Sequence, residues 1–371
     1  MLDFTRLGLQ LAAFADYRNE KEQAYRQSLA RALALLGMAD EGTVHHALKD
    51  APTTPLVALP REPLGYAVAP PERPSPITLV ATDGSQVSSG REVEPPFYLI
   101  NIGCVAFHLG TERRPLLASI PELYYGEEMW EDMLEDVSGS VTPQLVAALR
   151  DEKELHYLLH TALQEREAST PLVALLDGTL IRWSLQGMKQ AVVERELIER
   201  YVRLLQDFSD EGVLLAGYIS RPASREVVNL LQLLDQEADI ASLRDHHVFF
   251  HWLKPGERSA LFESGSHIQQ YYGSHKIHFF YIHMGREIGR VEVPGWVAES
   301  QKSIECIHAA LWDQGRKGQG YPVILAEAHE RAVVRVEEQE AFMALLRRHV
   351  MHRGGNMSDT RKRWSKRVPR I

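Results

Sequence analysis

The chain has 371 residues and a mass of 42.0 kDa, and 44% of its residues are hydrophobic and 25% charged. These proportions are ordinary for a soluble globular protein, and they exclude disordered, collagen-like and coiled-coil architectures for the bulk of the chain. The two cysteines, Cys104 and Cys306, are too few for a disulfide framework or a cysteine-based zinc site, and they fit a reducing compartment.

The ends of the chain and its longest apolar stretch bear on its location. The first ten residues, MLDFTRLGLQ, carry an acid at position 3 and lack a basic flank before an apolar core, so we expect no signal peptide. The stretch 96–109 is interrupted by Asn101 and is too short to span a bilayer. We therefore predict a cytoplasmic protein with no membrane contact.

The charge is unevenly spread. The net charge is 41 − 50 = −9, but the last eleven residues, RKRWSKRVPRI, hold six basic residues and no acid. The preceding 360 residues therefore carry 35 − 50 = −15. An acidic body argues against a broad nucleic-acid surface, whereas the basic tail over 351–371 leaves nucleic acid open as a partner.

The first half of the chain predicts an N-terminal helical region followed by alternating strands and helices. Helical spacing of apolar residues predicts a helix over 4–36 that ends at Gly37, within a helical region 1–50. Eight prolines in 51–76 predict an extended linker. The patterns that follow predict elements in this order: strands 77–82 and 97–108, helix 142–167, strand 172–176, helix 184–208 and strand 213–219.

The periodicity changes between residues 246 and 294. The runs HVFFHWL, KIHFFYIHM and REIGRVEV read as strands, the last two as a hairpin through Gly285. Helices are expected over 299–313 and 326–350. Alternating strands and helices with adjacent antiparallel strands predict an α/β fold with a mixed sheet, within one domain over 77–350.

Two predicted core strands end in the same kind of turn, Asp83-Gly84-Ser85 and Asp177-Gly178-Thr179. One interpretation is an ordinary Asp-Gly turn in each case. The other is a pair of carboxylates that meet at one end of a sheet, where burial requires a cationic or metal partner. Such a cluster suits phosphodiester hydrolysis by two Mg²⁺ or Mn²⁺ ions about 4 Å apart.

A helix predicted near the C-terminal end carries His329 and Glu330. A zinc-protease HExxH motif would need a second histidine at position 333, which is Val333, so that interpretation is excluded. His329 is then either a solvated histidine or a metal-binding or proton-transferring group beside the carboxylates. On helix 142–167, Glu152 and Glu154 lie on or near the apolar stripe, and either is able to reach the strand ends.

Several common catalytic motifs are missing from the sequence. It contains no GxxxxGK[ST], so we expect no ATP hydrolysis by this chain, and no GxSxG or strand-linked GxGxxG. None of the sixteen histidines has a cysteine partner at zinc-site spacing. Hydroxyl-nucleophile, dinucleotide and zinc-finger chemistry are therefore disfavoured.

The order of these motifs resembles the NurA nuclease family over about residues 75–345. The shared features are DGS after a first strand, a helix with acids, LLDGTL, GYISRP, PGERS and YPxxLAEAHExA. The resemblance implies an RNase H-like core that binds Mn²⁺ or Mg²⁺, with two ions expected. The residues that it implies are Asp83 and Asp177 as strand ligands, His329 as a helix ligand or proton-transfer group, Tyr321 lining the site, and Glu154 as the ligand from the acidic helix.

The choice of Glu154 follows the family's Arg-xxx-Glu-Leu pattern, which Arg150 and Glu154 fit; Glu152 is the alternative. Thr179 stands where the family often has serine, and both carry a hydroxyl.

The resemblance also implies an activity and partners. It implies a 5′-to-3′ exonuclease and single-strand endonuclease that acts on single-stranded DNA and double-strand ends during resection of double-strand breaks. It further implies a homodimer docked on a HerA-type hexameric ATPase, which agrees with the missing ATP motif. Two alternatives stay open: a non-catalytic adaptor that binds DNA ends or an ATPase, and a metal-dependent phosphoesterase that acts on RNA.

Overall fold

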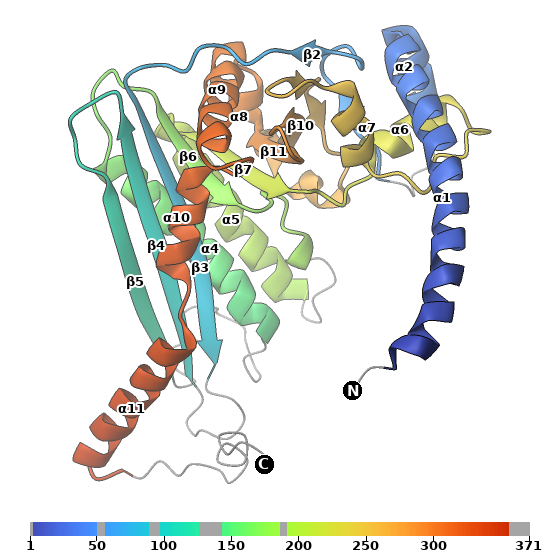
Figure 1. Ribbon diagram of the computed structural model, residues 1–371. Helices are drawn as coiled ribbons and strands as arrows, with labels where there is room; N and C mark the ends of the chain where they lie inside the picture. The colour runs from blue at the N-terminus through green and yellow to red at the C-terminus, as the bar shows by residue number, and fades with distance from the viewer. Residues whose placement is uncertain (1–2, 50–55, 89–96, 126–142, 186–190, 356–371) are drawn as a thin grey trace. The chain divides into compact units, whose positions relative to one another are not determined.

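The computed structural model describes residues 3–49, 56–88, 97–125, 143–185 and 191–355 (Figure 1). The chain divides into two compact units, each of which recruits segments far apart in the sequence. The first unit comprises Met1–Ser75, Gly178–Ile181 and Leu214–Val323, and the second comprises Pro76–Asp177, Arg182–Val213 and Ile324–Ile371.

The second unit contains a sheet with the strand order β6-β3-β4-β5. Its strands are β3 (Ile77–Ser88), β4 (Phe97–Leu109), β5 (Leu116–Tyr125) and β6 (Leu172–Asp177). β4 pairs antiparallel with both β3 and β5, whereas β6 pairs parallel to β3. A parallel pair needs a crossover connection, and α4 (Pro143–Gln164) supplies it before β6.

Helices cover both faces of this sheet, which explains its apolar central strands. Residues 77–82 of β3 and 172–176 of β6 are buried on both faces. In Figure 1, α4 lies behind β3 and β4, and α10 (Val323–Ala332) crosses in front of them. The second unit is completed by α5 (Ala191–Asp210), the short 3₁₀ helix η1 (Trp183–Leu185) and α11 (Val336–His352).

The first unit is built on antiparallel strands in the order β1-β9-β10-β11-β7, with β8 joining β10 and β2 joining β8. These strands are β1 (Leu59–Pro60), β2 (Ala67–Val68), β7 (Leu214–Ser220), β8 (Arg258–Ser259), β9 (Phe262–Glu263), β10 (Ile277–His283) and β11 (Ile288–Pro294). Its helices are α1 (Phe4–Met38), α2 (Glu41–Lys49), α6 (Glu226–Leu234), α7 (Asp245–Trp252), α8 (Gly295–Ala298) and α9 (Gln301–Lys317), with 3₁₀ helices η2 (His267–Tyr271) and η3 (Gly273–His275).

One hydrophobic core joins the C-terminal half of α1 to α6, α7 and the strands of the first unit. Leu29 and Leu36 of α1 belong to the same buried cluster as Phe249 of α7, Phe262 of β9 and Phe279 of β10. The rings of Phe249 and Phe262 lie 6.4 Å apart, and those of Phe262 and Phe279 lie 5.3 Å apart. These aromatic contacts hold the short strands of this unit against its helices.

The predicted mixed α/β fold is confirmed, as are the long first helix and the β10–β11 hairpin, whose Gly285 has a φ of 91°. Three predictions are wrong. The strand expected over 77–82 does not end in an Asp-Gly turn: β3 continues to Ser88, and Asp83 and Gly84 pair with β4 inside it.

The run HVFFHWL is helical: all of it except its last residue, Leu253, lies in α7. Seven residues fit a strand or a helix pattern equally, and Val248 and Phe249 are buried in the core. The helix predicted over 326–350 is two helices, α10 and α11, separated by residues 333–335.

Other differences concern boundaries and missed elements. β5 and α6 were not predicted, whereas α2 falls in the predicted helical region 1–50. Of the helix predicted over 184–208, residues 191–208 lie in α5, and 186–190 lie outside the described residues. Most of the basic tail, residues 356–371, lies outside the described residues, and the predicted domain ranges stay a prediction. Within the described parts of the chain, no helix is both long and apolar enough to cross a membrane.

Candidate active site

Asp83 and His329 meet on one face of the sheet in the second unit. Asp83 lies in the middle of β3, and its Oδ2 is 2.7 Å from Nδ1 of His329 on α10. With its proton on Nδ1, His329 donates a hydrogen bond to the carboxylate. The Asp83 side chain is 17% exposed and the His329 side chain 58%, so the pair has a buried end and a solvent-facing end.

The C-terminal end of α10 is fixed to the same face by side chains of β3 and β4. The carbonyl of Ala332 accepts hydrogen bonds from Ser85 Oγ at 2.5 Å and from Asn101 Nδ2 at 2.8 Å. Helix C-termini leave carbonyls without helical partners, and these two side chains supply them here. His329, one turn earlier, is therefore held at a set position above β3.

Glu154 approaches β3 from the opposite face. Successive side chains on a strand alternate between faces, and Thr82, unlike Asp83, donates a hydrogen bond to the Glu154 carbonyl of α4 at 2.9 Å. Gly84 lies on the same face as Thr82. A Cβ added at Gly84 would lie 2.4 Å from Glu154 Oε1, so the absence of a side chain there lets the buried carboxylate reach the strand.

The pKa of Glu154 is strongly displaced by its surroundings. Burial is the largest cause, and together with the negative charges of Asp151 and Asp83 it raises the pKa from 4.5 to about 8. Arg150 and Arg182 oppose this shift, and Arg150 Nε lies 3.1 Å from Glu154 Oε1. Crowded carboxylates that two arginines do not fully neutralise are typical of a functional site.

Asp177 ends β6 beside Asp83. The parallel pairing of β3 and β6 runs from Thr78 opposite Leu172 to Thr82 opposite Leu176, so Asp83 and Asp177 are the next residues on the two strands. Parallel register places such neighbours side by side on adjacent strands. Asp177 is exposed. We call Asp83, Glu154, Asp177 and His329 the Asp83 edge.

The remaining predicted residues lie elsewhere. Tyr321 belongs to the first unit, where its ring packs edge-on against Tyr218 at 5.7 Å. Glu152, the alternative to Glu154, has an Oε1 that lies 2.5 Å from Arg200 Nη2 on α5, in the second unit. Of the two acids on α4, Glu154 is the one beside Gly84.

The donor types at the Asp83 edge fit a hard divalent cation, although they are not gathered around one point. Across the part of the chain that the structure describes, no three His, Cys, Asp or Glu side chains converge closely enough to hold a metal ion. Asp83 and Glu154 lie on opposite faces of β3, and Arg150 pairs with Glu154. However, carboxylate oxygens are the ligands that Mg²⁺ and Mn²⁺ prefer, and burial together with the charges of Asp151 and Asp83 raises the pKa of Glu154.

Sequence reasoning missed two features of this site. The first is the role of Gly84, which the Asp-Gly turn pattern alone does not distinguish from an ordinary turn. The second is Arg182, whose Nη1 lies 3.0 Å from Asp151 Oδ2 and whose guanidinium covers the Tyr201 ring at 4.3 Å. The signal that could have identified Arg182 is its position directly after two apolar residues, Leu180 and Ile181.

Comparisons with known proteins place this geometry in context. The crystal structure of the NurA nuclease from Sulfolobus solfataricus is similar, with a TM-score of 0.52, 15% identity, and coverage of 94% of this chain and 99% of that chain. The catalytic domain of human endonuclease V matches at a TM-score of 0.34 and 13% identity, over 83% of this chain and 99% of that one. No curated protein sequence matches.

The family comparison rests on sequence. The family model of the NurA domain matches residues 77–334, which is more than half of the chain and includes all four residues of the Asp83 edge. This protein belongs to the NurA family.

Proposed function

We propose that this protein is a metal-dependent DNA nuclease and that the Asp83 edge is its active site. The observation that carries the proposal is the placing of Asp83 between two partners. His329 binds its carboxylate from one side, and its charge helps to raise the pKa of Glu154 on the other. Membership of the NurA family and the fold shared with the Sulfolobus NurA nuclease support the same conclusion.

The residues that would hold the metal are Asp83, Glu154, Asp177 and His329. The pairing of β3 with β6 stops at Thr82, so we propose the side of β3 beyond this point as the place where these carboxylates share a cation. When bound, Mn²⁺ or Mg²⁺ would polarise the phosphodiester and activate water. We expect two ions, because three carboxylates offer enough oxygen ligands for a pair of divalent cations.

The protein's own side chains have separate tasks in this proposal. Asp83 orients His329 through Nδ1, which leaves the exposed imidazole able to hold or move a proton at Nε2. Arg150 and Arg182 keep the acidic helix from accumulating unbalanced charge in the absence of metal. Gly84 keeps the strand thin enough for Glu154 to approach it.

The finer parts of the proposal concern substrate and partners. We propose 5′-to-3′ exonuclease and single-strand endonuclease activity during resection of double-strand breaks, in a homodimer that works with a HerA-type hexameric ATPase. The acidic body of the chain favours such a division of labour, because a ring-shaped partner would supply the positive channel for DNA. Tyr321 is proposed to line the path to the site.

The test is digestion of 5′-labelled single- and double-stranded DNA with Mn²⁺, Mg²⁺ or EDTA, with and without a HerA-type ATPase. We expect cleavage with metal, none with EDTA, and loss of cleavage in Asp83→Asn. Glu152→Gln is the matched control, since it neutralises an acid on the same helix and should keep activity. Labelled RNA in parallel distinguishes a phosphoesterase that acts on RNA.

Cleavage that persists unchanged in Asp83→Asn would contradict the assigned site. DNA or ATPase binding without cleavage under any metal would instead identify an adaptor.

A further inference from the structure

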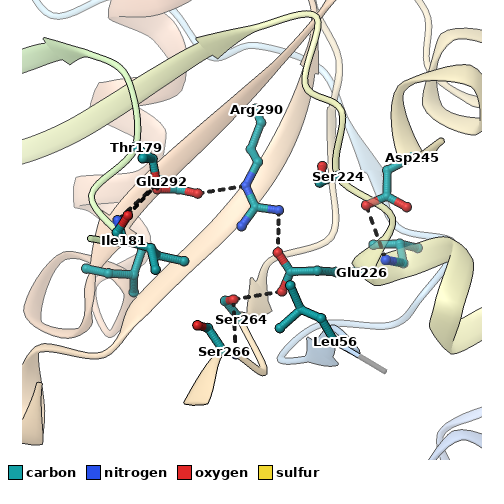
Figure 2. Close-up of polar contacts among 12 residues, drawn as sticks. Leu56, Thr179, Ile181, Ser224, Glu226, Asp245, Ser264, Ser266, Arg290 and Glu292 are labelled. Carbon is teal, nitrogen blue, oxygen red and sulfur yellow. Dashed lines mark hydrogen bonds and ion pairs between the residues drawn. The ribbon is translucent and has the colours of Figure 1, made fainter. Parts of the chain in front are cut away.

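Within the first unit, a fully buried glutamate binds Thr179 and Leu180 (Figure 2). Glu292 of β11 is 1% exposed, and its Oε2 accepts two hydrogen bonds of 2.8 Å, from Thr179 Oγ1 and from the backbone N–H of Leu180. Thr179 and Leu180 are the second and third residues after Asp177. One carboxylate oxygen therefore fixes the chain directly beyond a proposed metal ligand.

Glu292 is itself immobilised by a chain of buried contacts. Its Oε1 accepts a hydrogen bond of 2.8 Å from Arg290 Nε, and Arg290 Nη1 lies 2.7 Å from Glu226 Oε1. Ser264 Oγ donates to Glu226 Oε2 at 2.7 Å. We call Glu226, Ser264, Arg290 and Glu292 the Arg290 cluster; none is more than 2% exposed.

The turn between these anchors has a backbone that depends on glycine. Gly178 has a φ of 137°, in a region that residues with a side chain rarely adopt, and its N–H donates to the Tyr218 carbonyl at 2.9 Å. Asp177 is the residue directly before this turn and ends β6. A change at Thr179 reaches Asp177 through a single intervening residue, Gly178.

We propose that Glu292 is a positioning residue for Asp177, which it holds in place through Thr179 and Leu180 for metal binding. This inference rests on the proposed function of the Asp83 edge. Ion pairs buried for stability alone are often replaceable by apolar residues, whereas the oxygens of Glu292 are directed at the turn beside the ligand. Groups that orient metal ligands in this way typically change metal affinity by 10- to 100-fold when removed.

The test measures Mn²⁺ binding directly, by electron paramagnetic resonance of free Mn²⁺ in titrations of the full chain. Thr179→Val removes the hydroxyl at constant shape, and Glu292→Gln weakens the acceptor. We expect both to raise the Mn²⁺ dissociation constant roughly 10-fold or more, whereas Thr179→Ser, which keeps the hydroxyl, should stay within about twofold of wild type. Asp177→Asn gives the reference for loss of the ligand itself.

Ser264→Ala is the matched control. It removes one buried hydrogen bond of the Arg290 cluster that does not touch the turn, so we expect Mn²⁺ affinity within about twofold of wild type. Equal losses in Ser264→Ala and Thr179→Val would show a merely structural role and overturn the proposal. So would wild-type affinity in both Thr179→Val and Glu292→Gln, or an Asp177→Asn variant that binds Mn²⁺ normally.

The same titrations separate this inference from the proposed function. A wild-type protein that binds Mn²⁺ through Asp177 but cleaves no DNA would refute the nuclease, and weakened binding in Thr179→Val would still support the positioning role. Cleavage together with unchanged binding in the variants would refute the positioning role alone.

Discussion

The Arg290 cluster and the Asp83 edge both bring carboxylates into contact with arginine, but the surroundings of these carboxylates differ. In the Arg290 cluster, hydroxyl and amide donors occupy the oxygens of Glu226 and Glu292, and these two acids raise the pKa of Arg290 against the effect of burial. At the Asp83 edge, Glu154 has a pKa of about 8 although Arg150 lies beside it. In the first arrangement donors occupy the carboxylate oxygens, whereas in the second burial and neighbouring carboxylates raise the pKa of Glu154.

This difference distinguishes a structural network from a site that is completed by a ligand. A protein that needs rigidity surrounds a buried carboxylate with donors, because an unpaired one is costly. A protein that binds a cation keeps carboxylates close together and accepts their repulsion in the free state. Substitutions at the two places should therefore have opposite effects on activity and stability.

Asp83→Asn should lower Mn²⁺-dependent DNA cleavage by about a thousandfold or more, since charge stabilisation by a metal is worth several kcal/mol. The melting temperature should not fall, because the amide still reaches His329 and the repulsion with Glu154 disappears. Single-turnover cleavage and thermal unfolding measure the two effects. Equal losses of stability and activity would place Asp83 with the structural carboxylates.

Arg290→Met should have the opposite pattern, with a large loss of stability. It leaves Glu226 and Glu292 buried without their shared cation, which typically costs about 3–5 kcal/mol. Urea unfolding monitored by circular dichroism gives the free energy of unfolding. A change below about 1 kcal/mol would show that the two glutamates do not depend on this arginine.

Stability of the metal-free protein should fall as pH rises from about 4.5 to 8. The pKa of Glu154 is about 8 in the folded chain and near 4.5 when unfolded, so in this window the folded state holds a proton that unfolding releases. The contribution of Glu154 to the free energy of unfolding is complete below pH 4.5 and is lost as pH rises through 8. The loss amounts to up to a few kcal/mol. Glu154→Gln should remove this part of the pH dependence of stability. Urea unfolding at a series of pH values measures it. A variant with the same pH profile as wild type would refute the raised pKa of Glu154.

Gly84→Ala should displace Glu154. The added methyl would lie 2.4 Å from Glu154 Oε1 and 2.9 Å from Arg150 Cγ, and overpacking of this kind costs about 1–3 kcal/mol. We expect a loss of cleavage that exceeds the loss of stability, because the carboxylate moves away from β3. Gly8→Ala, where a Cβ would meet nothing within 4 Å, is the control.

Glu152→Gln should have the smallest effect. Glu152 and Arg200 have partly exposed side chains, and such ion pairs contribute about 0–1 kcal/mol. Cleavage should stay within about twofold of wild type. A loss comparable to that of Glu154→Gln would transfer the proposed role from Glu154 to Glu152.

The sequence predicted the central strands well and the peripheral elements poorly. Residues 77–82 of β3 and 172–176 of β6 are buried on both faces, so these apolar runs are visible in the sequence. The second half of β3 is only partly buried, so its pattern is weaker and the strand was predicted to end too early, at residue 82. β5 alternates between exposed and partly buried residues and contains Pro121, so its pattern is weak. The run HVFFHWL was misread because so short a segment cannot decide between the two periodicities.

The site was predictable in its parts but not in its geometry. Asp83 and Asp177 were both expected at strand ends, which holds for Asp177, whereas Asp83 lies inside β3. Choosing Glu154 over Glu152 required the family pattern around Arg150. Nothing in the sequence shows that the Asp83 side chain and Glu154 lie on opposite faces of β3, because that depends on how α4 and α10 pack against the strand. Glu292 lies in the predicted strand REIGRVEV, which also contains Glu287, so nothing in the pattern distinguished it.

The most direct test of the Asp83 edge is anomalous diffraction from crystals soaked in Mn²⁺. We expect an anomalous peak bound by Asp83 and Asp177, with Glu154 turned towards it and away from Arg150. The same soak of Asp83→Asn crystals should lack the peak. A peak elsewhere in the chain, or none in wild type at saturating Mn²⁺, would contradict the proposed active site.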